Sequence, residues 1–333
     1  MNNRAADRRV FLKSIAASAL NLASGVCMPA AMSVMRWGSS SLGSSGYVIM
    51  EAFAQTVNRH TGLRNSSLAT AGTAENMYLI GRGELEFAHS TSVDWLPALA
   101  GERPYSKPVR ANQLFAYAVW QQPLLVRARS GLRNLADLAG STFSPSLPGS
   151  GTAAMYKILM KTAGLYDRVR WRFGSWSEIY TAFRADQIDC VVGVLTNGRL
   201  SSGIQQLQSS VDIRVLGIPV STMEKARSSN PGIIPGSLVS RDWNIVDKPT
   251  PVPVMTGIVA CSPAISPETG YAVTKTILDH ATEVRKMGAP LSGLTLESAV
   301  RNLVDMAPVN AGAARYFQER GVWRDDLTIA SDM

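Results

Sequence analysis

Three loops rich in serine, threonine and glycine contain the residues that are best suited to bind a ligand. They span residues 43–47, 71–76 and 149–152, and each lies between a stretch typical of a strand and a stretch typical of a helix. A helix N-terminus presents unpaired backbone N–H groups and the positive end of the helix dipole. Glycine lets a ligand approach the backbone closely, and hydroxyl groups add donors. The pattern therefore predicts binding of an anion, although serine and threonine also cap helices that bind nothing.

Signatures of catalysis are missing from the sequence. It contains no G-x-S-x-G elbow, no G-x-x-x-x-G-K-[ST] loop and no G-x-G-x-x-G turn. The histidines are dispersed, and only His89, at the end of a predicted strand, is placed to face a cleft. No pair of carboxylates suggests an acid–base couple. We therefore expect a protein that is not an enzyme and that holds no cofactor and no metal.

Strands alternate with helices along most of the chain, which predicts an α/β fold with sheets flanked by helices. In such folds ligands bind beyond the carboxyl ends of the strands, where the three loops should lie. A length of 333 residues suggests two domains or lobes. The segment 219–253, rich in proline, serine and asparagine, is predicted to be irregular.

Composition and charge narrow the class further. The chain is 46% hydrophobic and 17% charged, as expected of a globular protein. Its net charge is +8, of which +3 belongs to the N-terminal segment, leaving +5 (8 − 3). No cluster of lysine and arginine with interleaved aromatic residues follows, so nucleic acid is not an expected partner. The positive excess fits an anionic ligand or membrane surface, although it also serves solubility.

The N-terminus has the pattern of an export signal. Residues 7–13, Asp-Arg-Arg-Val-Phe-Leu-Lys, resemble a twin-arginine signal, and the alanine-rich stretch 14–26 is typical of its apolar region. We expect a signal peptide over residues 1–33 and a periplasmic location; the alternative is a cytosolic helix. In that compartment Cys190 and Cys261 could form a disulfide or remain buried thiols, and their spacing does not suggest a zinc site.

Over residues 34–324 the chain resembles the TAXI-type solute-binding proteins of TRAP transporters. Four stretches carry the resemblance: the loop that ends in Gly46-Tyr47; Ala-Thr-Ala-Gly-Thr-Ala-Glu-Asn at 69–76; the segment 127–152, which ends in Pro-Gly-Ser-Gly-Thr; and Asn-Ala-Gly-Ala-Ala-Arg-Tyr-Phe-Gln-Glu-Arg-Gly at 310–321. The chain departs from the family where Ala71 replaces a glycine, Thr73 a serine, and Asn310-Ala311 a His-Pro pair.

The resemblance implies a two-lobed, type II periplasmic-binding-protein fold, with a mostly parallel sheet in each lobe and the ligand between them. The first lobe would comprise residues 34–124 and 252–333, and the second residues 125–251. A monomer would close over a carboxylate or amino acid, such as a dicarboxylate or glutamate, and deliver it to a TRAP membrane permease. The family motifs and the loop positions together predict a ligand-binding set of Ser44, Tyr47, Thr70, Thr73, Asn76, Ser90, Trp95, Ser150, Gly151, Thr152 and Asn197.

The sequence is also compatible with other functions. A protein of the same fold could serve a sensor kinase or an ABC importer. An exported enzyme would need a nucleophile or a cofactor anchor, and a structural envelope protein would bind no small molecule.

Overall fold

The computed structural model describes residues 34–42 and 44–331. The described residues all belong to one compact unit. The predicted signal peptide, residues 1–33, lies outside the described residues. Among the described residues, no helix combines the length and the apolar character that a membrane span requires.

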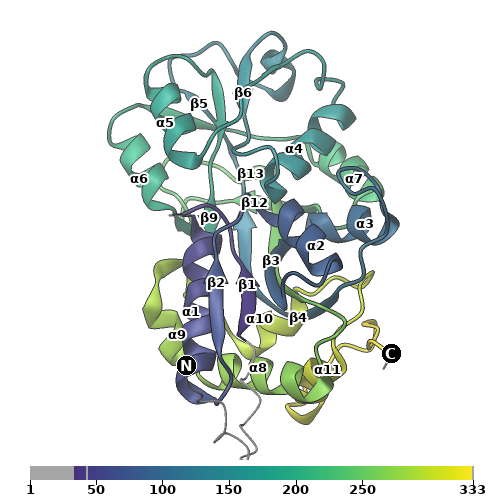
Figure 1. Cartoon of the computed structure of the whole chain (residues 1–333). Coiled ribbons are helices and arrows are strands. Elements are labelled where there is room, and N and C mark those ends of the chain that lie inside the picture. Colours follow the sequence, from purple (N-terminus) through teal and green to yellow (C-terminus); the bar gives the residue numbers. More distant parts are fainter. Residues whose placement is uncertain (1–33, 43, 332–333) are drawn as a thin grey trace, which may run out of the picture. The chain divides into compact units, whose positions relative to one another are not determined.

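The larger of two sheets has eight strands and lies in the lower half of Figure 1. Its strand order is β10-β9-β4-β13-β3-β1-β2, and β12 pairs with β13 beside this path. β1, β2 and β3 pair in parallel, whereas β13 runs antiparallel to β3, β4 and β12. The strands are β1 (Met35–Gly38), β2 (Asn65–Leu68), β3 (Phe87–Thr91), β4 (Asn112–Gln121), β9 (Leu195–Thr196), β10 (Arg199–Leu200), β12 (Ile234–Leu238) and β13 (Thr250–Cys261).

The smaller sheet has five strands in the order β11-β5-β8-β6-β7. It combines antiparallel pairs (β11 with β5, β5 with β8) and parallel pairs (β6 with β8 and with β7). Both sheets are therefore mixed rather than mostly parallel, because β4, β5, β11 and β13 run against their neighbours. These strands are β5 (Leu124–Arg127), β6 (Thr142–Ser144), β7 (Arg170–Trp171), β8 (Cys190–Val192) and β11 (Ile213–Leu216).

Helices flank both sheets, and several begin at residues that cap them well. Ser44, Ser150, Ser175, Ser201 and Ser266 each accept a hydrogen bond from a backbone N–H in the first turn of their helix. The helices are α1 (Ser45–His60), α2 (Thr73–Gly81), α3 (Ser92–Ala100), α4 (Gly151–Thr162), α5 (Trp176–Arg184), α6 (Ser202–Gln208), α7 (Val220–Ser229), α8 (Pro267–Asp279), α9 (Ala281–Val284), α10 (Leu296–Arg301) and α11 (Ala311–Glu319), with 3-10 turns η1 (Leu135–Leu138), η2 (Arg285–Met287) and η3 (Ala289–Leu291).

The chain passes between the sheets more than once. It leaves the larger sheet after β4, returns from β8 to β9, leaves again through α6 to β11, and returns through α7 to β12. Three short strands that lie within residues 125–251, β9, β10 and β12, therefore pair with the larger sheet.

The prediction that residues 219–253 are irregular was wrong. This segment contains α7, the strand β12 and the start of β13. Two of its proline residues lie where they are readily accommodated: Pro219 precedes the first turn of α7, and Pro235 lies in β12, which in the described structure pairs with β13 alone.

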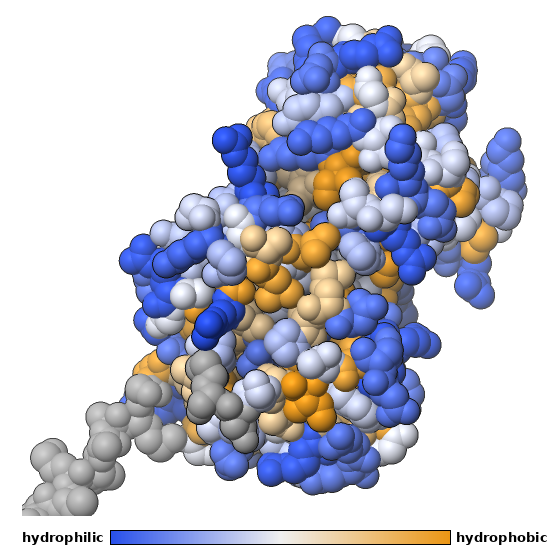
Figure 2. Space-filling view, turned by 90° about the vertical axis from the view of Figure 1, so that its right-hand side faces the viewer, coloured by the Kyte–Doolittle hydropathy of each residue, from blue (hydrophilic) through white to orange (hydrophobic). Residues whose placement is uncertain are grey.

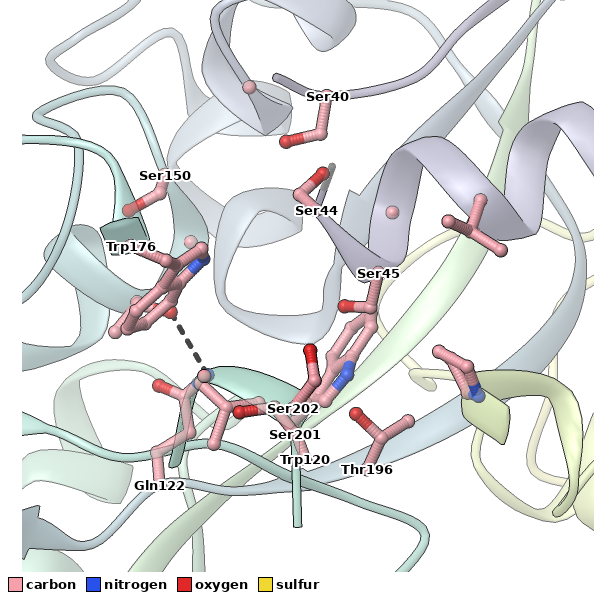
Figure 3. A pocket seen from close by; sticks show the side chains of 18 of the residues that line it. Ser40, Ser44, Ser45, Trp120, Gln122, Ser150, Trp176, Thr196, Ser201 and Ser202 are labelled. Carbon is pink, nitrogen blue, oxygen red and sulfur yellow. Dashed lines mark hydrogen bonds between the residues drawn. The ribbon is translucent and has the colours of Figure 1, made fainter. Parts of the chain in front are cut away.

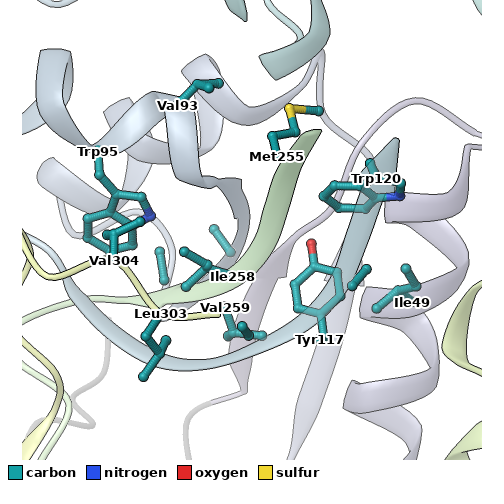
Figure 4. Packing of buried hydrophobic residues seen from close by; sticks show 14 of the residues in the cluster. Ile49, Val93, Trp95, Tyr117, Trp120, Met255, Ile258, Val259, Leu303 and Val304 are labelled. Carbon is teal, nitrogen blue, oxygen red and sulfur yellow. The ribbon is translucent and has the colours of Figure 1, made fainter. Parts of the chain in front are cut away.

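Aromatic residues fill the core of the larger sheet. Trp37, Phe53 and Phe87 are fully buried, and the Trp37 and Phe87 rings lie 4.5 Å apart. Phe53 also meets Tyr117 edge to face at 5.6 Å, and Tyr117 continues towards Trp120 at the far end of β4 (Figure 4). The packing therefore fixes the position of Trp120. On the surface, Figure 2 shows hydrophobic residues about the middle of one face and hydrophilic ones above and below them.

Candidate ligand-binding site

A cavity of about 510 Å³ lies where the N-termini of several helices and the end of β4 meet. This volume is within the range of small-molecule sites. Figure 3 shows serine side chains from the start of α1 on one side and Gln122, Ser201 and Ser202 on another. Its polar and charged lining comprises Ser40, Ser44, Ser45, Thr73, His89, Thr91, Gln122, Ser150, Thr152, Ser177, Arg184, Thr196, Arg199, Ser201, Ser202 and Gln206. Its apolar lining comprises Val48, Trp120, Trp176, Tyr180, Val194, Leu200, Met255, Ala289 and Pro290.

The first turns of α1, α2, α4 and α5 all contribute to the lining. Ser44 caps α1 by accepting from the N–H of Tyr47 at 3.2 Å, and Ser150 caps α4 by accepting from that of Ala153 at 3.1 Å. At α2 the capping position is Gly72, whose φ of 136° favours glycine and which offers no side-chain acceptor. The remaining N–H groups and the positive ends of four helix dipoles favour an anion in this cavity.

The charged side chains of the cavity lining also favour an anion. Arg184 and Arg199 line the cavity, and both are exposed. Within the described part of the chain, the lining contains no aspartate and no glutamate. An anion therefore meets two guanidinium groups and no carboxylate at the cavity wall.

A buried carboxylate lies behind the wall. Asp94 is 4% exposed and accepts from the hydroxyl of Thr73 at 3.0 Å and from the backbone N–H of Thr91 at 2.8 Å. Burial raises the pKa of Asp94 to about 6, and the hydrogen bonds from Thr91 and Thr73 oppose that rise. Asp94 thus holds the hydroxyl of Thr73, and the end of β3 at Thr91, in fixed orientations.

His89 forms part of the cavity floor. Its Nδ1 pairs with the hydroxyl of Tyr117, and its Cδ2 and Nε2 face Gly46 at the start of α1, where a Cβ would lie 2.8 and 3.0 Å away. Burial lowers the pKa of His89 to about 4, so the ring is neutral near pH 7. A neutral imidazole that accepts the Tyr117 proton on Nδ1 carries its own hydrogen on Nε2, towards the cavity.

Gln122 and Trp120 close the cavity at the end of β4. The Nε2 of Gln122 donates to the Oγ1 of Thr152 at 3.0 Å, the bond drawn in Figure 3. The Oε1 of Gln122 and the Nε1 of Trp120 are both buried without a hydrogen-bond partner in the described structure.

Five of the residues predicted from the sequence lie together in this lining. They come from the first, second and third loops, which supply the starts of α1, α2 and α4: Ser44, Thr73, Ser150, Gly151 and Thr152.

Three predicted residues in or beside the first two loops lie outside the lining. Tyr47 is half-buried on α1. The hydroxyl of Thr70 donates to the carbonyl of Ser39 at 3.1 Å. Asn76 is fully buried, and its amide donates to the carbonyls of Ser39 and His89, which joins the loops beside α2.

The other three predicted residues also make contacts inside the protein. Ser90 donates to the carbonyl of Ile258 at 2.8 Å within the sheet, because its side chain points across to β13. Trp95 is fully buried in the core. Asn197 accepts from the N–H of Val119 at 2.9 Å and donates to the carbonyl of Pro290 at 3.1 Å, holding a turn in which its own φ is positive.

Sequence reasoning missed Trp120, Gln122, Arg184 and Arg199. The first two follow from β4, which the sequence did not reveal as a strand; the arginines lie at the end of α5 and on a two-residue strand. Ser201 carried a usable signal, since a serine precedes the helical segment that starts at Ser202.

The cysteines and histidines outside the cavity have structural roles. Cys190 and Cys261 are both buried as free thiols. His60 stacks on His280 with ring centroids 3.7 Å apart and pairs with Glu283. Across residues 34–42 and 44–331 no group of histidine, cysteine and acidic side chains could hold a metal ion.

The chain is similar to solved structures over nearly its whole length. A Xanthomonas citri protein solved with bound ATP has a TM-score of 0.51 at 14% identity, covering 87% of this chain and 97% of that one. A Bordetella bronchiseptica RB50 protein has a TM-score of 0.50 at 18% identity, covering 88% and 90%. The periplasmic aliphatic sulphonate binding protein of Escherichia coli has a TM-score of 0.44 at 14% identity, covering 89% and 95%.

The predicted fold class is confirmed as α/β: the described unit has two sheets flanked by helices and shares the fold of the Xanthomonas citri and Bordetella bronchiseptica structures. No curated protein matches the sequence significantly. Residues 38–321 match the NMT1-like family. Since the match covers most of the sequence, the chain belongs to the NMT1-like family.

Proposed function

We propose that this protein is the solute-binding component of a membrane transporter and that it captures a small organic anion in the cavity. One observation carries the proposal: the first turns of four helices and two arginines surround a space whose described lining has no acidic side chain. Helix N-termini and arginine side chains both favour negative charge. The protein would bind its ligand without changing it.

The most specific form of the proposal is a TAXI-type protein of a TRAP transporter. The sequence motifs support it, and three of their stretches supply residues to the cavity wall at Gly46, Thr73 and Ser150. The ligand class is then a dicarboxylate, a glutamate-like molecule or another amino acid. The alternative client is an ABC importer or a sensor kinase, and the genes beside this one would discriminate between them.

Export and closure complete the proposal. The twin-arginine pattern in residues 7–13 would send the folded protein to the periplasm. There, lobes formed by residues 34–124 with 252–333 and by residues 125–251 would close over the ligand. Contacts between the loop before α4 and the first turn of α2 would form part of this closure: Ala74 donates its N–H to the carbonyl of Gly149 at 3.3 Å.

A thermal-shift screen tests the proposed function. The full-length protein is first unfolded and refolded to remove any co-purified ligand, then heated with amino acids, dicarboxylates, sulfonates and ATP, which the Xanthomonas citri protein binds. A ligand at a hundredfold excess over its Kd stabilises the native state by about 2.7 kcal/mol. A rise in Tm with one chemical class supports the proposal, and Arg184→Gln should reduce it. No rise with any anion, from folded protein, would contradict it.

A further inference from the structure

The buried carboxylate of Asp94 is bonded directly to two residues of the cavity wall. Its Oδ1 accepts from the hydroxyl of Thr73 at 3.0 Å, and its Oδ2 accepts from both the hydroxyl and the backbone N–H of Thr91. Thr73 and Thr91 both line the cavity, at the start of α2 and at the end of β3. An anion held at the first turn of α2 would therefore lie about two hydrogen-bond lengths, or roughly 6 Å, from this carboxylate.

The partners of this carboxylate in the described structure are hydroxyls and a backbone N–H, none of which carries a charge. The titratable groups near it are Tyr105, from the segment after α3, and Tyr117, from β4; burial raises the pKa of each, so both phenols are neutral. His89 in β3 pairs with Tyr117 and is also neutral near pH 7. On α2, Glu75 is exposed and bonds to the N–H of Ala71. Neither β13 nor the first turn of α4 contains a charged residue. When it is ionised, the carboxylate is thus a negative charge without a countercharge.

An anion at α2 and an ionised Asp94 repel each other. At an effective dielectric constant of about 20, two unit charges roughly 6 Å apart change a binding equilibrium about 100-fold. Protonation of Asp94 removes the repulsion and keeps the hydrogen bonds. The proton is expected on Oδ1, which has one donor where Oδ2 has two. Asp94 can then donate to the Thr73 oxygen, which releases the hydrogen of the Thr73 hydroxyl for another acceptor.

We propose that the protein captures its anion together with a proton, which Asp94 takes up from solvent, so that the affinity for the anion rises as the pH falls. This inference rests on the proposed function and adds a pH-dependent control to the same site. Burial raises the pKa of Asp94 to about 6 in the free protein, so only about a tenth of the molecules carry this proton at pH 7. A nearby anion raises that pKa further. Its contribution to binding is complete at low pH and is lost as the pH rises through the pKa of the complex.

The dependence of the Kd on pH tests the proposal on the refolded full-length protein. Glutarate, 2-oxoglutarate, glutamate and ethanesulfonate are titrated by calorimetry at about pH 6, 7 and 8, where their acidic groups stay ionised. If the complex holds the proton tenfold more tightly than the free protein, the Kd should be about 5-fold lower at pH 6 than at pH 8. If it holds the proton a hundredfold more tightly, the decrease should be about 25-fold. A constant Kd for a probe that binds would overturn the proposal.

Proton uptake can also be counted in the unsubstituted protein. The same titration at about pH 7 is repeated in Bis-Tris, imidazole and Tris, which differ in ionisation enthalpy and provide no anionic competitor. The dependence of the binding heat on that enthalpy gives the number of protons taken up. We expect about 0.4 to 0.8 proton per bound anion for the two strengths of coupling above. A count of zero would overturn the proposal, whether or not any variant folds.

Asp94→Asn tests whether Asp94 is the group that takes up the proton. Asparagine keeps an acceptor for Thr91 and cannot ionise, so its Kd should change less than about twofold from pH 8 to pH 6 and lie within about threefold of the wild-type value at pH 6. Asp137→Asn is the matched control, because Asp137 has the same place in the capping box of η1 but lies outside the cavity lining. Backbone N–H groups hold the pKa of Asp137 below its usual value, so this variant should keep the wild-type pH profile. His89→Gln should keep most of the profile, because burial lowers the pKa of His89 to about 4.

The outcomes distinguish this inference from the proposed function. A probe that binds without proton uptake and with a constant Kd overturns the inference and leaves the proposed function in place. A pH profile that persists in Asp94→Asn but disappears in His89→Gln would also overturn it, since the proton would then be held by His89. If no probe binds to the folded protein, the proposed function fails, and the inference fails with it.

Discussion

Replacing Gly151 by alanine should disrupt the contact between the start of α4 and the end of β3 at Thr91. A Cβ at this position would lie 2.4 Å from the Oγ1 of Thr91 and 2.8 Å from its Cγ2, whereas ordinary contact begins at 3.4 Å. The two segments would have to separate by about 1 Å (3.4 − 2.4). Thr91 cannot yield, because it is 1% exposed and both its backbone N–H and its hydroxyl are bonded to Asp94.

The expected cost is about 1–3 kcal/mol, typical of an overpacked contact. Alanine favours a helix over glycine by about 1 kcal/mol, so without the clash the variant would be more stable. If the contact forms when the ligand binds, the cost appears as a Kd raised about 5- to 150-fold; if it exists in the free protein, it appears in the free energy of unfolding. Calorimetric titration measures the Kd, and urea denaturation of the same sample measures the free energy of unfolding.

Gly149→Ala is the matched control in the same loop. Its Cβ would meet only the carbonyl oxygen of Ala71, at 3.9 Å, which is ordinary contact. Gly149→Ala should therefore leave the Kd and the free energy of unfolding close to those of the wild type. Equal behaviour of the Gly151 and Gly149 variants would refute the reasoning.

Further changes should have equally distinct effects. Gly312→Ala should lower the free energy of unfolding by about 3 kcal/mol or more, because its Cβ would lie 1.7 Å from the Pro267 carbonyl oxygen. Gly131→Ala is the control: its Cβ would have no atom within 4 Å, so the free energy of unfolding should change by less than about 0.5 kcal/mol in the same urea titration. Arg199→Gln should weaken anion binding about 3- to 10-fold at low salt and less at high salt, measured by calorimetry at two ionic strengths. Burial raises the Asp94 pKa from 3.8 to about 6, so protonation of Asp94 stabilises the native state as the pH falls from about 6 to 4. Burial lowers the His89 pKa from 6.5 to about 4, so His89 destabilises the native state as the pH falls over the same interval. The two effects, about 3 kcal/mol each at most, oppose each other. Thermal unfolding against pH should therefore show Asp94→Asn losing more stability than the wild type on acidification and His89→Gln losing less, and parallel profiles would contradict the assignment.

The parts of the fold that could be predicted are those whose signals are local. Serine at positions 44 and 150 lies in loops that the sequence placed before helices, and it caps α1 and α4. The glycine-rich loops that bring Thr73 and Gly151 to the cavity could likewise be recognised, because strand, loop and helix follow one another within a short stretch. These signals were enough to predict an α/β fold and part of a candidate site.

The missed elements depend on contacts distant in sequence. Residues 112–121 form β4, which is buried on both faces for most of its length and so lacks the alternation of a half-buried strand. Its partner β13 lies more than a hundred residues further on. Without β4, nothing in the sequence indicates that Trp120 and Gln122 reach a cavity. Trp95 shows the reverse error: its place after a strand suggested a cleft, but α3 turns it into the core.

The structure also changes the role expected of the hydroxyl groups. The sequence suggested serine and threonine hydroxyls as donors to an anion, but several already donate within the protein: Thr73 to Asp94, and Ser150 to the carbonyl of Leu147 at 2.8 Å. Among the described residues the hydroxyl of Ser44 accepts from Tyr47 and donates to none, so its own hydrogen is available to a ligand. Much of the attraction for an anion must therefore come from backbone N–H groups and arginines, which do not depend on which small polar residue caps a helix. Under the proposed function, the exchange of serine for threonine at position 73 would therefore leave the charge preference of the cavity unchanged.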